Sequence, residues 1–66
     1  MKNTLKVERA KNNMTQQELA EGLSVSRQTI VAIESCRFNP STKLALKIAE
    51  ILHCSVHDLF FLEDGD

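Results

Sequence analysis

The sequence predicts an all-α fold, a compact bundle of five short helices. Three observations support this prediction: helix-capping residues recur along the chain, apolar residues behind them repeat with helical spacing, and β-branched residues never alternate over the length of a strand. The helices are expected near residues 3–12, 16–23, 27–35, 42–52 and 56–61.

The first predicted helix, residues 3–12, depends on its apolar spacing alone. Leu5 lies on one side of it, whereas Val7 and Ala10 lie nearly opposite, so the helix has two narrow apolar stripes. The second stripe either contacts a partner or is simply exposed, and we expect exposure, since single apolar side chains are common on protein surfaces.

The starts of the other helices are marked by capping residues. Thr15 and Glu18 have the spacing of a capping box, in which each side chain accepts a hydrogen bond from the other residue's backbone N–H. Later starts are marked by Ser26, by Pro40-Ser41 and by Ser55-Val56-His57-Asp58.

The third predicted helix, residues 27–35, has two unlike faces. At 100° per residue, Ile30 and Ile33 lie together on one side. The other side carries Gln28, Val31, Ala32 and Ser35, with Arg27 at its edge. In the DNA major groove, glutamine can read adenine, arginine can read guanine, and small apolar side chains can contact thymine methyl groups.

Length predicts one small domain, and charge permits DNA binding without establishing it, since an ordinary surface can also be asymmetric in charge. The 66 residues have room for a single core, so we expect one domain over residues 1–66. The formal net charge is −1, but all eight basic residues lie within residues 1–47, together with four acidic ones. The rest of the chain has five acidic residues and ends in an acidic tail, residues 63–66. A basic body with an acidic end can still present a positive face to DNA.

Other classes of protein fit poorly. The longest apolar run has four residues, too few for a membrane span, and the N-terminus does not resemble a signal peptide. Together with two cysteines that we expect to be free thiols, this predicts a cytoplasmic location.

Catalytic and metal-binding chemistry is not expected either. The only ligand-like cluster, His53-Cys54 with His57, lacks the four ligands of a structural zinc site. Cys36 has no resolving thiol nearby in the sequence, and neither a nucleophile elbow nor a phosphate-binding glycine loop is present. We therefore predict a protein that is not an enzyme and has no metal and no cofactor.

The residues around the third helix resemble those of the phage-repressor-like (Cro-type, or XRE) helix-turn-helix family, and above all its minimal single-domain bacterial members. The resemblance covers residues 5 to about 62 and includes Thr15-Gln16-Gln17-Glu18-Leu19-Ala20, Val25-Ser26-Arg27-Gln28-Thr29-Ile30, Ile33-Glu34, Pro40-Ser41 and Leu44 to Ile48. It implies a lambda-repressor-like DNA-binding domain whose recognition helix is residues 27–35.

The resemblance also implies roles for single residues. The residues that it implies to read bases are Arg27, Gln28, Thr29, Val31 and Ala32. The residues that it implies to bind phosphate are Gln16, Ser26, Ser35, Arg37 and Asn39. Arg9 and Glu34 match a buried structural ion pair. In one respect the chain departs from the family: where glycine usually ends a helix it has Asn13, Ser24, Cys36 and His53, which predicts modest stability.

The expected function is sequence-specific binding of double-stranded DNA, with repression by occlusion of a promoter. A homodimer reading a palindromic operator is expected, because one recognition helix reads few base pairs. Its predicted interface is the apolar run Leu59, Phe60, Phe61 and Leu62, which one small core cannot bury completely. The alternative is a simple C-terminal core plug, in which Leu59 and Phe60 are buried and Phe61 or Leu62 stays exposed.

Two alternatives remain open. An antitoxin-like or partner-binding module would use the apolar C-terminal segment to hold another protein, with DNA binding for autoregulation. A membrane-facing or structural adaptor would keep the fold without contacting DNA, although the pair Arg27-Gln28 favours DNA.

Overall fold

The helix starts agree with the capping residues. Thr15 Oγ1 accepts a hydrogen bond from Glu18 N at 3.0 Å, and Glu18 Oε1 accepts one from Thr15 N at 2.9 Å, which completes a capping box. The side chains of Ser26, Ser41 and Ser55 each accept from the backbone N–H three residues later. Local hydrogen bonds therefore set where four of the five helices begin.

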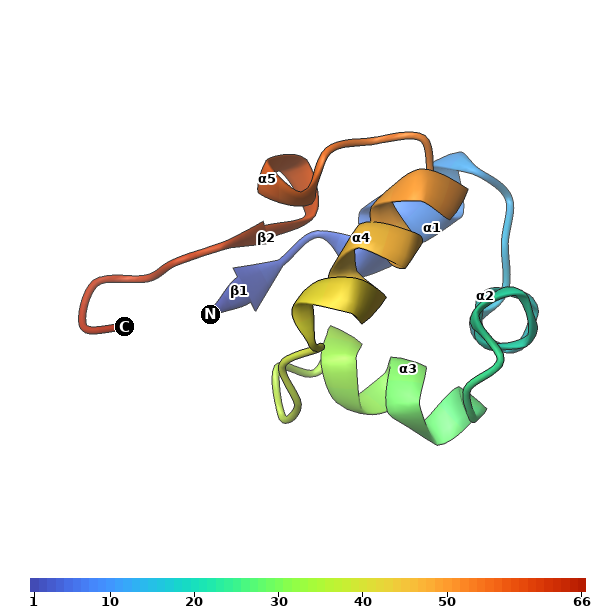
Figure 1. Ribbon diagram of the computed structural model, residues 1–66, viewed down its shortest axis with the longest axis horizontal. Coiled ribbons are helices and arrows are strands. Elements are labelled where there is room, and N and C mark those ends of the chain that lie inside the picture. Colours follow the sequence, from blue (N-terminus) through green and yellow to red (C-terminus); the bar gives the residue numbers. More distant parts are fainter.

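The computed structural model describes residues 1–66 as five helices and one two-stranded sheet. Figure 1 shows α2 end-on and α3 beside it in the plane of the view, so the two helices are steeply inclined to each other, as in a helix-turn-helix, and the predicted all-α helix-turn-helix fold is confirmed. In chain order the elements are β1 (Lys2–Asn3), α1 (Leu5–Lys11), α2 (Gln16–Leu23), α3 (Arg27–Glu34), α4 (Thr42–Ile51), α5 (Val56–Leu59) and β2 (Phe60–Phe61).

The helical prediction was wrong at both ends of the chain. Asn3 and residues 60–61 were expected in helices, but β1 and β2 pair antiparallel, with Lys2 opposite Phe61 and Asn3 opposite Phe60. Helix α5 ends at Leu59, whose carbonyl oxygen accepts from Thr4 N at 2.9 Å. This pairing satisfies backbone groups at opposite ends of the sequence, so no local pattern could indicate it.

One hydrophobic cluster lies between the helices. Its twelve buried members are Leu5, Leu19, Ala20, Leu23, Ile30, Ile33, Ala45, Ile48, Ala49, Leu52, Leu59 and Phe60. Leu59 is fully buried and Phe60 is 7% exposed, so the expectation that these two face a second copy is wrong: they pack into the core of their own chain. Phe61 and Leu62 remain exposed, at 43% and 76%.

The four residues that replace glycine at helix ends all have left-handed backbone. The φ angles of Asn13, Ser24, Cys36 and His53 are 54°, 58°, 62° and 56°. For an L-residue this conformation costs roughly 1 kcal/mol, and asparagine tolerates it best. The chain therefore carries backbone strain at four turns, including the turn between α2 and α3.

Candidate nucleic-acid interface

Helix α3 turns one face to the core and the other to solvent, as its sequence indicates. Ile30 and Ile33 are fully buried, and they fix the helix on the core. Arg27 and Gln28 are exposed in its first turn, and Thr29, Val31 and Ala32 are half-buried beside them. The solvent face of α3 therefore combines one cation, one amide and several methyl groups, all of which can contact base edges in a major groove.

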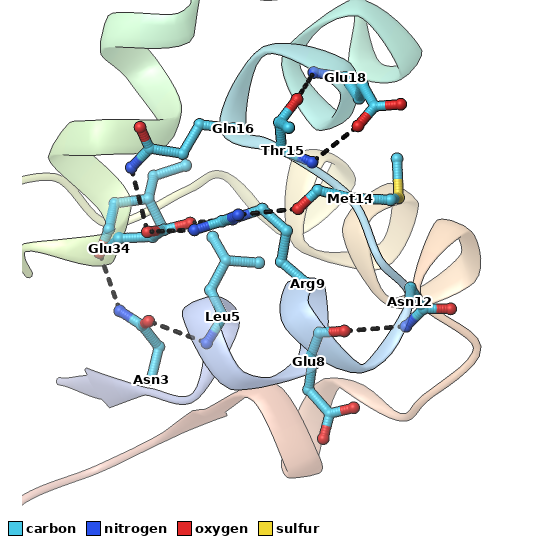
Figure 2. A network of polar contacts seen from close by, with 11 residues as sticks. Asn3, Leu5, Glu8, Arg9, Asn12, Met14, Thr15, Gln16, Glu18 and Glu34 are labelled. Atoms are coloured by element: carbon cyan, nitrogen blue, oxygen red, sulfur yellow. Dashed lines mark hydrogen bonds and ion pairs between the residues drawn. The ribbon is translucent and has the colours of Figure 1, made fainter.

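A buried ion pair holds α3 in place. Arg9 Nε on α1 donates to Glu34 Oε2 at 2.8 Å, and the two side chains are only 14% and 9% exposed. Figure 2 shows the same guanidinium reaching the carbonyl oxygen of Met14, at 2.7 Å, and Gln16 Nε2 donating to Glu34 Oε1 at 3.2 Å. The last residue of α3 is thus tied to α1 and to the start of α2.

Asn3 forms a second tie to the C-terminal end of α3. Its Nδ2 donates to the carbonyl oxygen of Ile33 at 2.8 Å, and its Oδ1 accepts from Leu5 N at 3.1 Å (Figure 2). Asn3 belongs to β1, so this side chain links the small sheet directly to the end of α3.

The residues expected to bind phosphate are arranged in two groups. Gln16 and Ser26 lie at the N-terminal ends of α2 and α3, where Gln16 contacts Glu34 and Ser26 caps α3. In the loop after α3, Arg37 Nε donates to Ser35 Oγ at 2.9 Å, and Asn39 is exposed. The structure brings Ser35 and Arg37 together and leaves the guanidinium of Arg37 at the surface.

A polar hollow of about 490 Å³ lies beside the N-terminus of α2. Its lining consists of Arg9, Thr15, Gln16, Gln17 and Arg27. The guanidinium of Arg9 is already paired with Glu34, so Arg27 is the cation of this hollow that has no carboxylate partner. A helix N-terminus with nearby cations is a favourable place for an anion. Gln17 was not among the predicted site residues, and its position in the first turn of α2 is the sequence signal that could have indicated it.

A second hollow, of about 380 Å³, lies along one edge of the exposed face of α3. It is lined by Ser26, Gln28, Thr29, Ala32 and Phe38. Phe38 is in the loop after α3 and is 47% exposed. The sequence prediction passed over Phe38, although an aromatic residue between Arg37 and Asn39, two predicted DNA contacts, was a usable signal.

An apolar surface lies on a different side of the molecule. Exposed Leu46 on α4, Phe61 on β2 and Leu62 border two shallow hollows that share Met1, Val56 and Phe60. In Figure 1, β2 and the C-terminal segment project on the side of the molecule away from α2. We call Leu46, Phe61 and Leu62, together with Met1 and Val56, the terminal apolar surface.

The remaining reactive side chains form no site. No group of three or more His, Cys, Asp or Glu residues could hold a metal ion. Cys36 is exposed and Cys54 is half-buried, and burial raises the pKa of the Cys54 thiol. None of the helices has the length and apolar character needed to span a membrane.

Comparison with known proteins gives consistent results. A family model described as helix-turn-helix matches residues 5–59. An uncharacterised HTH-type transcriptional regulator of Methanocaldococcus jannaschii is 52% identical over 66 residues, the full length of both chains. Another from Bacillus subtilis is 42% identical over 64 residues, 97% of each chain.

Solved structures share the fold. The crystal structure of a proposed DNA-binding protein from Bacteroides fragilis superimposes with a TM-score of 0.81 at 33% identity, covering 88% of this chain and 94% of that one. The clp gene regulator ClgR of Corynebacterium glutamicum gives 0.76, also at 33% identity, with 82% of this chain and 57% of ClgR covered.

Proposed function

This chain belongs to the phage-repressor-like (XRE) helix-turn-helix family of DNA-binding transcriptional regulators, and we propose that it is a repressor that binds a specific duplex site and occludes a promoter. The observation that carries the proposal is the exposed face of α3, where Arg27 and Gln28 stand in the first turn above buried isoleucines. In our proposal α3 enters the major groove, with Arg27, Gln28, Thr29, Val31 and Ala32 contacting bases.

Phosphate contacts on both flanks of α3 position it in the groove. On one flank, the hollow between Arg9 and Arg27 receives a backbone phosphate, and Gln16 at its edge donates to the same group. On the other flank, Ser35, Arg37 and Asn39 follow the backbone of the DNA. The acidic tail, residues 63–66, is on the side of the terminal apolar surface, away from α2, where it repels phosphates least (Figure 1).

Homodimerisation through the terminal apolar surface is part of the proposal. Phe61 and Leu62 are large apolar side chains with no place in the core, and Leu46 adds a third from α4. Aromatic and large apolar groups are typical of the centres of protein interfaces. Pairing there leaves α2 and the exposed face of α3 free, so that two recognition helices can read half-sites about 34 Å apart.

The proposed regulator works in the cytoplasm, where the DNA is, without catalysis and without a cofactor or metal. Its activity depends on occupancy of DNA alone. In the alternative function, that of an antitoxin-like module, the terminal apolar surface holds a different protein, and the assembly state separates that function from ours.

Selection of bound sites from random duplex DNA tests the DNA-binding proposal. We expect a two-fold symmetric consensus, with specific affinity that falls steeply as salt is raised, because each neutralised phosphate releases counterions. Weak binding to all sequences, with little salt dependence, would contradict it.

Sedimentation equilibrium at micromolar concentration tests the dimer. We expect about twice the 7.4 kDa chain mass for the native protein, and a monomer for Phe61→Ser. Val7→Ser, at an exposed valine of α1, is the matched control and should remain a dimer. A native monomer, with operator binding unaffected by Phe61→Ser, would contradict dimerisation.

A further inference from the structure

We propose that the hollow between Gln28 and Phe38 receives the 5-methyl group of a thymine in the bound DNA, which makes Phe38 a specificity-determining residue. The inference rests on the proposed function, and it adds a residue from outside the recognition helix to the reading of bases. It also specifies one base pair of each half-site, an A·T pair next to Gln28.

The position of Phe38 is set by α3 itself. The backbone N–H groups of Arg37 and Phe38 both donate to the carbonyl oxygen of Ala32, at 2.9 and 3.2 Å. The loop is therefore anchored to the last turns of α3, and the ring of Phe38 forms a wall of the hollow opposite the helix. When α3 docks in a groove, the ring of Phe38 is therefore brought to the DNA together with the helix.

The hollow presents a mostly apolar surface to an incoming base pair. The hydroxyl groups of Ser26 and Thr29 lie 3.0 Å apart and form a hydrogen bond with each other. The groups that remain for contact with a base are the methyl groups of Thr29 and Ala32 and the ring of Phe38. No charged side chain lines it, so it is poorly suited to a phosphate. It is an open surface hollow of about 380 Å³, so the edge of a base can approach it with its methyl group foremost.

The amide of Gln28 determines which base pair fits. Glutamine can donate to adenine N7 and accept from adenine N6, and the thymine of the same pair carries its 5-methyl group in the same groove. The exposed amide and the apolar hollow adjoin each other, so together they match both halves of an A·T pair. A G·C pair presents an N4–H₂ donor from cytosine and no methyl group, so it lacks the apolar contact with the hollow.

The exposure of Phe38 is consistent with this role. Phe38 is outside the hydrophobic cluster and is 47% exposed, so its ring is not needed to close the core. Contact with a thymine methyl would remove this apolar surface from water, which is favourable.

Deoxyuridine substitution tests the inference, because it removes only the 5-methyl group of thymine. After selection of the preferred site, each thymine of one half-site is replaced in turn, and affinity is measured by fluorescence anisotropy. We expect one position at which the native protein loses about fourfold, the value for one buried methyl group. Phe38→Ala should bind the thymine site more weakly by a similar factor and should lose little more on the deoxyuridine site. Phe38→Leu should retain most of the effect, because it keeps an apolar wall.

The control variant is Val7→Ala, which removes exposed apolar surface from α1 and should retain the full thymine preference. Circular dichroism checks that each variant is folded. If a site is selected but no deoxyuridine substitution weakens binding, or if Phe38→Ala loses equally on both DNAs, the inference is wrong while the proposed function stands. If no preferred site emerges, both are wrong.

Discussion

The α2–α3 unit, residues 16–34, and the two chain ends, residues 1–4 and 60–66, are organised by different interactions. In the α2–α3 unit, caps such as Thr15 with Glu18 join groups three residues apart. At the chain ends, β1 pairs with β2 from the far end of the sequence. The first kind of contact is visible in a local pattern, whereas the second exists only once the core has formed.

This difference explains what could be predicted of the fold. Capping hydroxyls and the spacing of Ile30 and Ile33 are local, and the helices they predict are present. Phe60 was expected in a helix because nothing near it in the sequence requires an extended backbone. Its backbone at φ −126° and ψ 132° follows from pairing with Asn3, which helical periodicity cannot reveal.

The same difference applies to the candidate site. The outward face of α3 follows from its periodicity, so the positions of Arg27 and Gln28 could be predicted. The aromatic residue between two predicted DNA contacts could have indicated Phe38, but its position as a wall beside α3 could not be predicted, because it depends on how the loop folds back on the carbonyl oxygen of Ala32. The binding roles of these residues remain predictions.

The largest effect is expected from Glu34→Ala, which removes the tie between the α2–α3 unit and α1. The change leaves the guanidinium of Arg9, only 14% exposed, without its carboxylate partner at 2.8 Å. We expect a loss of about 3 kcal/mol in the free energy of unfolding, measured with urea.

Lys11→Ala is the matched control for this ion pair. Lys11 pairs with Glu8 at 3.2 Å but is 66% exposed, so its loss should change stability by less than about 0.5 kcal/mol. Similar effects of the two substitutions would mean that the buried pair does not fix α3 on α1.

The next prediction assigns base reading to the α2–α3 unit. Gln28→Ala should weaken binding to the preferred site by about 1–3 kcal/mol and change binding to random DNA much less. Arg37→Ala, in the exposed loop, should weaken binding to all sequences and reduce the salt slope by about one unit. Equal losses on both DNAs for Gln28→Ala would remove this residue from the base-reading set.

A smaller effect is expected where the two regions meet. Asn3→Ala leaves the N–H of Leu5 without a partner and removes one of the two hydrogen bonds to the carbonyl oxygen of Ile33, which keeps that from Cys36 N, so the unfolding free energy should fall by about 1–2 kcal/mol. Lys2→Ala, at the exposed neighbour in β1, is the control and should be near neutral. If Asn3→Ala is as mild as Lys2→Ala, the sheet and α3 are energetically independent.

The smallest effect is predicted for two residues with left-handed backbone, one inside the α2–α3 unit and one outside it. Ser24 lies in the turn between α2 and α3, and His53 precedes α5; their φ angles are 58° and 56°. Glycine adopts this backbone without the clash of a Cβ atom, but it also increases the entropy of the unfolded chain. Ser24→Gly and His53→Gly should therefore each stabilise the protein by only about 0.5–1 kcal/mol in urea unfolding.

Two further variants separate relief of strain from other effects of glycine. Asn13→Gly should gain less, since asparagine tolerates the left-handed conformation best. His57→Gly places glycine inside α5, where it should destabilise by up to about 1 kcal/mol. If His53→Gly and His57→Gly change stability in the same direction, the left-handed turn before α5 is not strained. If only Ser24→Gly is stabilising, the turn between α2 and α3 is strained, whereas the turn before α5 is relaxed despite its positive φ.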